Sequence, residues 1–209
     1  MKFIFFIFYC LLIPTGFNKL YAHPTTYEGG FSIMSEMSKK KQETLLIYSS
    51  KYWLGTGLVF IKYPEIPYLL SSQIGFLIKR WNLPSAQGNI YFFGGLAHFL
   101  ENKTRLIYRL GGQLDYETRR IYSFIKYTEH RFFENNKEIQ DELNLAFGVA
   151  PYVAEFDELN SWIIVKVVIS DRFNKKSYVS LLRFFYKNFL WEIGQSLNGN
   201  PEFNFMIRF

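Results

Sequence analysis

The sequence predicts an all-β fold, namely a closed antiparallel up-and-down transmembrane β-barrel of about 12 strands, and about ten strands also fit the pattern. Three observations predict it: short segments in which apolar and polar residues alternate, an apolar N-terminal leader, and a last strand that ends on an aromatic residue. Aromatic residues make up 20% of the chain and the mean hydropathy is −0.03, as expected when apolar and polar residues alternate. No apolar run after residue 22 is long enough to form a membrane-spanning helix.

The last eight residues form the clearest predicted strand. Phe203, Phe205, Ile207 and Phe209 alternate with more polar residues, so one face of the strand is apolar and mainly aromatic. In an outer-membrane barrel such a face meets lipid while the opposite face meets the lumen. We therefore interpret these four residues as a barrel-assembly signal of a Gram-negative outer-membrane protein. The alternative is an edge strand of a β-sandwich, or a soluble barrel whose apolar faces turn inward.

Residues 1–22 read as a cleaved signal peptide, which leaves residues 23–209 as the outer-membrane β-barrel. The leader has a positive first segment and a short apolar core, and it ends on the small residue Ala22. Cys10 is the single cysteine of the chain and lies in the leader, so the mature chain would contain none. Disulfides and thiol catalysis are thereby excluded from the predicted barrel.

The remaining strands follow from period-two alternation and from the turns between them. Within 104–117, for example, Leu110 faces one side and Arg109 the other. A change of phase between Phe124 and Ile125 predicts a bulge. The predicted strands cover residues 27–36, 43–50, 52–63, 68–79, 89–100, 104–117, 120–132, 142–150, 161–172, 177–187, 189–198 and 202–209. An even strand number places both chain ends at the periplasmic rim.

The connections between these strands are short and mostly polar. The longest predicted outer loop is Phe133–Gln140, and the longest predicted periplasmic turn lies near Asn82–Gly88. No loop is long enough to fold into the lumen as a constriction, so we expect a small, compact barrel.

Charged residues on the non-apolar faces are expected to line the lumen. These are Lys79, Arg105, Arg109, Asp115, Glu117, Glu142, Lys166, Arg183, Glu192 and Arg208. Their balance is positive, in line with a formal net charge of +6, and this favours anionic solutes. The alternative is that the charges pair across a packed interior and hold the barrel closed.

The histidines offer little support for an enzyme or a metal site. A lipid hydrolase would need a nucleophile and a base within reach, and neither His98 nor His130 lies near a serine motif. If cleavage exposes His23, its α-amine and imidazole could chelate copper, but a plain cleavage-site residue is the preferred interpretation. We therefore predict no enzyme, no cofactor and no internal metal site.

Several stretches resemble a little-studied family of small Gram-negative outer-membrane β-barrel proteins, some of them associated with heavy-metal resistance functions. The matching stretches are His23-Pro24, Tyr27-Glu28-Gly29-Gly30, Leu77-Ile78-Lys79-Arg80-Trp81-Asn82, Val149-Ala150-Pro151-Tyr152, Leu159 with Trp162, and Phe203 to Phe209. The resemblance implies the barrel fold and the outer-membrane location, and it associates the chain with metal-ion handling.

Together these observations predict porin-like passage or binding of small solutes. The expected partners are outer-membrane lipid and lipopolysaccharide, the barrel-assembly machinery and small solutes, with no nucleic acid. The alternatives are an outer-membrane lipid-modifying hydrolase and a structural barrel with a plugged lumen.

Overall fold

A computed structural model describes residues 24–64, 66–101, 105–134, 138–155, 157–171 and 175–209. The predicted signal peptide and His23 lie outside these residues. The described residues include no helix that could cross a membrane. They form the strands β1 (Phe31–Ser38), β2 (Gln42–Lys51), β3 (Leu54–Lys62), β4 (Leu69–Leu83), β5 (Ala86–Phe99), β6 (Ile107–Thr118), β7 (Ile121–Phe132), β8 (Glu138–Val149), β9 (Asn160–Ser170), β10 (Lys175–Tyr186), β11 (Phe189–Ser196) and β12 (Pro201–Arg208).

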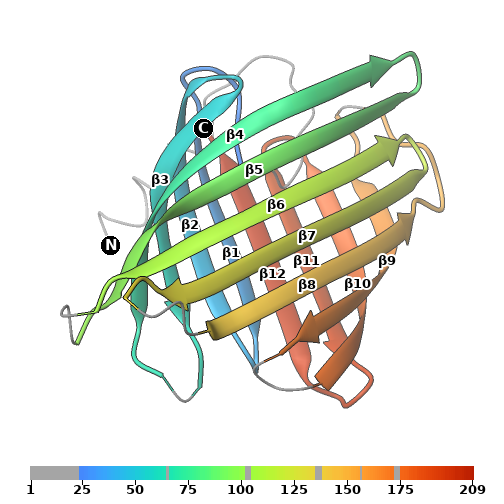
Figure 1. Cartoon of the computed structure of the whole chain (residues 1–209). Helices are drawn as coiled ribbons and strands as arrows, with labels where there is room; N and C mark the ends of the chain where they lie inside the picture. The colour runs from blue at the N-terminus through green and yellow to red at the C-terminus, as the bar shows by residue number, and fades with distance from the viewer. Residues whose placement is uncertain (1–23, 65, 102–104, 135–137, 156, 172–174) are drawn as a thin grey trace, which may run out of the picture.

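The strands close into one antiparallel barrel (Figure 1). Each strand pairs with its neighbours in the chain, and β1 pairs with β12 to complete the ring. At this seam Phe31 and Phe209 exchange backbone hydrogen bonds, with N···O distances of 3.0 and 2.8 Å. The closed up-and-down barrel of twelve strands confirms the predicted fold class. We call the end where β1 begins and β12 ends the terminal rim, and the opposite end the distal rim.

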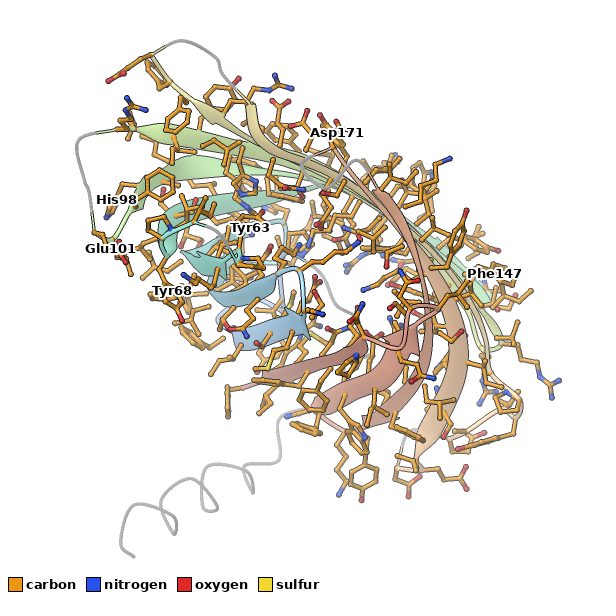
Figure 2. The ribbon with its side chains drawn as sticks, turned by 90° about the horizontal axis from the view of Figure 1, so that it is seen from below. Tyr63, Tyr68, His98, Glu101, Phe147 and Asp171 are labelled. Atoms are coloured by element: carbon orange, nitrogen blue, oxygen red, sulfur yellow. The ribbon has the colours of Figure 1, made fainter. Side chains whose placement is uncertain are left out.

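The outer face of the barrel is apolar. Phe147 points away from the interior in the view from below (Figure 2) and is 55% exposed. The same holds on other strands for Leu58, Leu96, Leu114, Val165 and Ile193, which are 43–54% exposed. A continuous exposed apolar band of this kind is the lipid-facing surface of a membrane barrel.

β12 shows how the alternation produces two faces. Glu202, Asn204 and Arg208 point inward and are each at most 7% exposed. Phe203 and Phe209 point outward and are 41% and 38% exposed. The predicted aromatic face of β12 is therefore part of the outer surface of the barrel.

The interior also contains an apolar cluster near the distal rim, which the sequence did not predict. Its members come from β2, β3, the connection after β3, β4, β5, β6 and β8: Leu45, Ile47, Val59, Ile61, Tyr63, Leu69, Ala97, Ile107 and Ile139. These strands carry apolar residues on both faces, so alternation alone could not show which side faced the lumen. The cluster fills the distal half of the lumen on the β2–β6 side.

Three segment predictions were wrong. The predicted loop Phe133–Gln140 is shorter, because β8 already begins at Glu138. β1 begins at Phe31, and residues 27–30 form a turn in place of the first strand residues that alternation predicted. The predicted turn at Asn82–Gly88 is instead mostly strand, because β4 reaches Leu83 and β5 starts at Ala86. A two-residue turn at 84–85 is enough to connect them.

The bulges also differ from the prediction. β7 keeps its phase through Phe124 and Ile125, because Tyr122 and Phe124 face the lumen although they are aromatic. Register shifts lie elsewhere: between Ser49 and Lys51 in β2, between His130 and Arg131 in β7, and between Leu77 and Lys79 in β4. This bulge moves every later residue of β4 to the opposite face.

Candidate functional site: the barrel lumen

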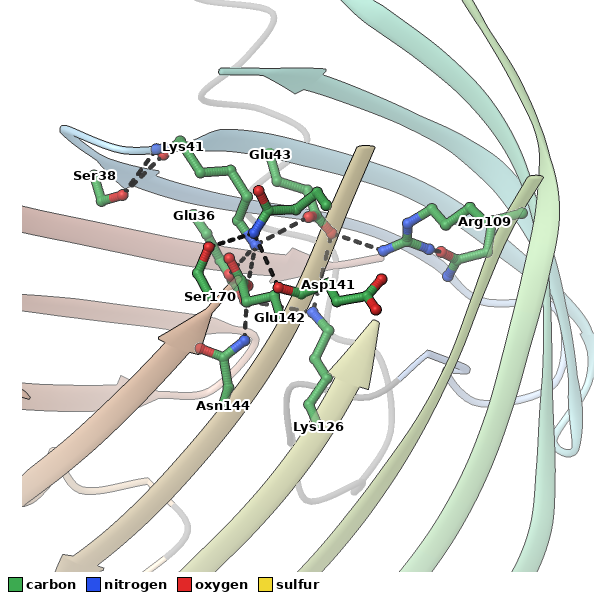
Figure 3. Close-up of polar contacts among 12 residues, drawn as sticks. Glu36, Ser38, Lys41, Glu43, Arg109, Lys126, Asp141, Glu142, Asn144 and Ser170 are labelled. Carbon is green, nitrogen blue, oxygen red and sulfur yellow. Dashed lines mark hydrogen bonds and ion pairs between the residues drawn. The ribbon is translucent and has the colours of Figure 1, made fainter. Parts of the chain in front are cut away.

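A set of charged side chains crosses the lumen and meets at Lys41, in the connection after β1. The Nζ of Lys41 lies 2.6 Å from Oε1 of Glu142, 3.3 Å from Oε2 of Glu43 and 3.9 Å from Oε2 of Glu36 (Figure 3). Lys41 directly precedes β2, whereas Glu142 belongs to β8, which stands opposite β2 in the ring. One lysine therefore connects opposite walls of the barrel.

Arg109 and Lys126 extend this set of charges. Arg109 on β6 is 2% exposed, and its Nη2 lies 3.0 Å from Oε1 of Glu43. Its guanidinium also donates a hydrogen bond to Gln73 and lies 4.9 Å from the ring centroid of Phe93. The Nζ of Lys126 on β7 is 3.8 Å from Oε1 of Glu36 on the opposite strand β1. We call Glu36, Lys41, Glu43, Arg109, Lys126 and Glu142 the transluminal belt.

A second set of charges follows the wall from β9 to β12. The Nε of Arg183 lies 2.6 Å from Oε1 of Glu192, and Asn204 donates a hydrogen bond of 2.6 Å to the other oxygen of that carboxylate. Lys166 forms an ion pair with Glu202. All four charged side chains are 9–14% exposed. We call Lys166, Arg183, Glu192, Glu202 and Asn204 the lateral ladder.

Most of the charged residues expected in the lumen do lie there. Arg109, Asp115, Glu142, Lys166, Arg183, Glu192 and Arg208 point inward, and Glu117 lies at the terminal rim. The structure brings Glu142 into the transluminal belt with Arg109, and Lys166, Arg183 and Glu192 into the lateral ladder.

Lys79 and Arg105 do not line the lumen, which corrects the prediction. The bulge in β4 turns Lys79 to the exposed outer side. Arg80 faces inward instead, and its Nε donates a 2.7 Å hydrogen bond to Oδ1 of Asn89. Arg105 precedes β6 and is exposed at the distal rim, where its guanidinium lies 5.4 Å from the ring centroid of Phe132.

The sequence prediction missed several charged residues of the lumen, and these residues change the balance of positive and negative charge there. The missed residues are Glu36, Lys41, Glu43, Arg80, Lys126 and Glu202. With them, acidic and basic side chains are equally represented in the described part of the lumen, so it is close to neutral rather than positive. Alternation could have placed Glu202 and Glu43, since both face inward in regular strands. Lys41 lies in a connection, where no periodicity applies.

Three recesses follow one another along the β8–β12 side of the lumen. A distal recess of about 60 Å³ and a middle recess of about 80 Å³ share Glu36, Lys166 and Asn204 as lining residues. The middle recess and a terminal recess of about 630 Å³ share Arg183 and Leu190. The terminal recess also reaches the turn between β4 and β5 and the end of β6. We call the two places where neighbouring recesses share lining residues the narrow points, and the lateral ladder supplies a charged residue to each.

The geometry offers no support for a histidine-based active site. His98 lies on the outer side of β5 (Figure 2). His130 is 2% exposed inside the lumen. Its ring packs edge-on against the ring of Tyr63, with 6.4 Å between the two ring centroids. The two histidines thus lie on opposite faces of the wall. Among the described residues, no three His, Cys, Asp or Glu side chains are grouped as a metal ion would require.

The sequence and the fold were also compared with known proteins. No protein-family model and no curated protein matches the chain. Among solved structures, the KdgM porin in complex with disordered oligogalacturonate is similar with a TM-score of 0.51 and 10% identity, over 86% of this chain and 98% of that one. OccK8 (OprE) of Pseudomonas aeruginosa is similar with a TM-score of 0.41 and 7% identity, over 85% of this chain and 62% of that one. The chain therefore has the twelve-stranded barrel fold that is also found in an outer-membrane porin.

Proposed function

We propose that this protein is a Gram-negative outer-membrane pore that passes small polar solutes along the β8–β12 side of its lumen. The observation that carries the proposal is the row of three recesses, which runs from the distal rim to the terminal rim beside the lateral ladder. Apolar side chains fill the distal part of the other half of the lumen. A solute that crosses the barrel would therefore follow the polar wall.

The sizes of the recesses limit what can pass. The distal and middle recesses, of about 60 and 80 Å³, are small beside the terminal recess of about 630 Å³. The distal and middle recesses are therefore the tightest part of the proposed path. This favours ions and small polar metabolites over oligomers.

The charges suggest a modest preference for anions. Each narrow point has a cation paired with a carboxylate, so the path itself is nearly balanced. Lys39 and Lys40 line the distal recess beside Lys41, and this adds positive potential where a solute would first arrive. We propose small anionic solutes as the favoured cargo, selected by attraction at the distal rim.

The surroundings of the protein follow from the same proposal. The apolar outer face would contact outer-membrane lipid and lipopolysaccharide, and β12 would be recognised by the barrel-assembly machinery through Phe203, Phe205, Ile207 and Phe209. The association with metal-ion handling, which comes from the family resemblance, stays a prediction. Copper binding at His23 also stays a prediction, because His23 lies outside the described residues.

Planar-bilayer recording of the refolded mature chain tests the proposal. We expect stepwise conductance and a reversal potential that indicates weak anion preference in a KCl gradient. Liposome swelling with anionic and cationic solutes of equal size would check the preference. Correctly folded barrels that insert without any conductance, both as the mature chain and as a variant that lacks residues 24–26, would refute passage and favour the structural barrel with a plugged lumen.

The hydrolase alternative has its own test. Purified protein would be incubated with phospholipid and with lipid A, and released fatty acid would be measured. We expect no release above that of a His130→Ala variant. Turnover that this substitution abolishes would overturn the proposal of a non-enzymatic pore.

A further inference from the structure

The first described residues of the chain enter the barrel instead of extending away from it. Residues 24–30 precede β1 at the terminal rim, and we call them the N-terminal strap. Pro24 is buried, and Thr25 and Thr26 are 3% and 6% exposed. Pro24 lines a small recess together with Glu43, Gln73 and Arg109, so the strap reaches the level of the transluminal belt.

The wall of the barrel provides a fitted seat for the strap. Gly55 on β3 and Gly75 on β4 are direct register partners. A Cβ added to either residue would lie 2.9 Å from the carbonyl oxygen of Pro24. Real side chains do not approach backbone this closely, so the absence of a side chain at both positions is what lets the strap lie against the wall.

The strap is anchored most firmly where it joins the rim. The backbone N–H of Gly29 donates to the carbonyl of Ser49 over 2.8 Å, and the N–H of Ser49 donates to the carbonyl of Gly30 over 3.0 Å. Gly29 has a φ of +76°, which supplies the sharp turn into the lumen. Nζ of Lys51 and Oε1 of Glu28 add an exposed ion pair at 2.7 Å.

The inner part of the strap has fewer polar contacts. The N–H of Thr26 donates to Oγ of Ser49 over 2.7 Å. The hydroxyls of Thr26 and Tyr27 are buried without a hydrogen-bond partner among the described residues. Moving these hydroxyls to the rim would return them to water and remove the free-energy cost of burying them without a partner. This cost disfavours the position of the strap inside the lumen. A chain end held by so few contacts detaches at a lower free-energy cost than unfolding of the whole barrel requires.

The strap stands next to the proposed path. The recess that Pro24 lines shares Met34, Glu36, Gln113 and Lys126 with the middle recess. We propose that the N-terminal strap is a built-in plug, and that its withdrawal toward the terminal rim widens the middle of the pore. This inference rests on the proposed passage of solutes, because it assigns the strap a role in limiting that passage.

Substitutions at the seat test the plug by electrical recording. Gly75→Ala places a methyl group against the carbonyl of Pro24, and a deletion of residues 24–26 removes the inner strap. We expect both variants to show a larger single-channel conductance than the mature wild-type chain. Gly112→Ala is the matched control, because the nearest atom to a Cβ there is the Tyr91 oxygen at 3.6 Å, an ordinary contact.

A reversible tether gives a second measurement. Thr26→Cys with Ser49→Cys, made in the mature chain, which has no other cysteine, would join the strap to β2 by a disulfide. We expect the oxidised protein to stay at the lowest conductance level and the reductant to restore transitions to higher levels. Folding of each variant would be checked by its heat-modifiable mobility in detergent gels.

The outcomes separate the plug from the pore. A mature chain that conducts, with a deletion variant and a Gly75→Ala variant of unchanged conductance, would overturn the plug and leave the pore intact. A closed mature chain and a conducting deletion variant would support both. If correctly folded mature chain and deletion variant are both silent, the proposed passage fails and the plug fails with it.

Discussion

The narrow point between the middle and terminal recesses provides the most direct test of how the lumen treats charge. Arg183 lines both recesses, and its Nε is held 2.6 Å from Oε1 of Glu192. Arg183→Met keeps an unbranched apolar stem and removes the guanidinium. Glu192 then retains its 2.6 Å hydrogen bond from Asn204, so its carboxylate stays in place and unbalanced. The narrow point would change from neutral to negative.

The expected size of the effect follows from Coulomb's law. A unit charge about 4 Å from a passing ion contributes about 1 kcal/mol at the dielectric constant of water and about 4 kcal/mol at an effective value of about 20. Since about 1.4 kcal/mol corresponds to a tenfold change, the anion-to-cation permeability ratio should fall at least about fivefold. The reversal potential in a KCl gradient measures this ratio directly. Dilute salt of about 0.1 M keeps the Debye length near 10 Å, so the charge is not screened away.

A matched control separates the local charge from the net charge of the protein. Lys187→Met removes one positive charge from the turn after β10, where the lysine is exposed and its Nζ lies 5.1 Å from the Tyr186 ring centroid. We expect this variant to keep the wild-type reversal potential. If Arg183→Met conducts with an unchanged reversal potential, ions do not pass Arg183 and the proposed path is wrong.

Three further predictions address the barrel itself. Glu142→Gln should lower the free energy of unfolding by about 1.5–3 kcal/mol, because it removes the charge-assisted contact with Lys41 while Lys41 keeps Glu43 and Glu36, and urea titration in lipid vesicles would measure it. A loss no larger than that of Glu28→Gln, at an exposed ion pair, would argue against a stabilising belt. Val165→Arg on the outer face of β9 should cost about 2–4 kcal/mol in the same assay if that face meets the middle of the bilayer, and an unchanged unfolding midpoint would contradict the lipid-facing assignment. Removing Phe209 eliminates the two seam hydrogen bonds to Phe31 and part of the proposed assembly signal, so the amount of folded protein in isolated outer membranes should fall, and an unchanged amount would show that assembly does not depend on this residue.

The transluminal belt explains how a narrow barrel can contain many charges. Charged groups removed from water are costly unless each one meets a partner of opposite sign. In this lumen Lys41 contacts three carboxylates and Glu43 contacts both Lys41 and Arg109. Each charged group of the belt finds a partner of opposite sign because the network spans the barrel. The same side chains occupy the lumen near Lys41 and narrow it there.

Alternation in the sequence was sufficient to determine the class of fold and the two faces of the regular strands. Residues such as Leu114 and Asp115 on β6 are neighbours in the chain, and they must lie on opposite sides of any strand that contains them. Which of the two faces points outward followed from the aromatic face of β12. Exposed side chains such as Phe203 and Phe209 are stable there only if that face contacts the hydrocarbon of a membrane. Local sequence thus indicated about twelve strands, with ten also fitting the pattern, and placed most of the charged inner residues.

Only the tertiary structure decided which residues meet across the lumen and which side of it stays open. Lys41 reaches Glu142, a residue 101 positions away, because ring closure places β2 opposite β8. Because of the bulge at Leu77/Lys79, Arg80 faces the lumen and Lys79 faces outward, and no periodicity in β4 indicated this. The N-terminal strap enters the lumen because Gly55 and Gly75 lie side by side on adjacent strands. Such contacts depend on strand register and on closure of the ring, and these are properties of the whole barrel rather than of any single segment.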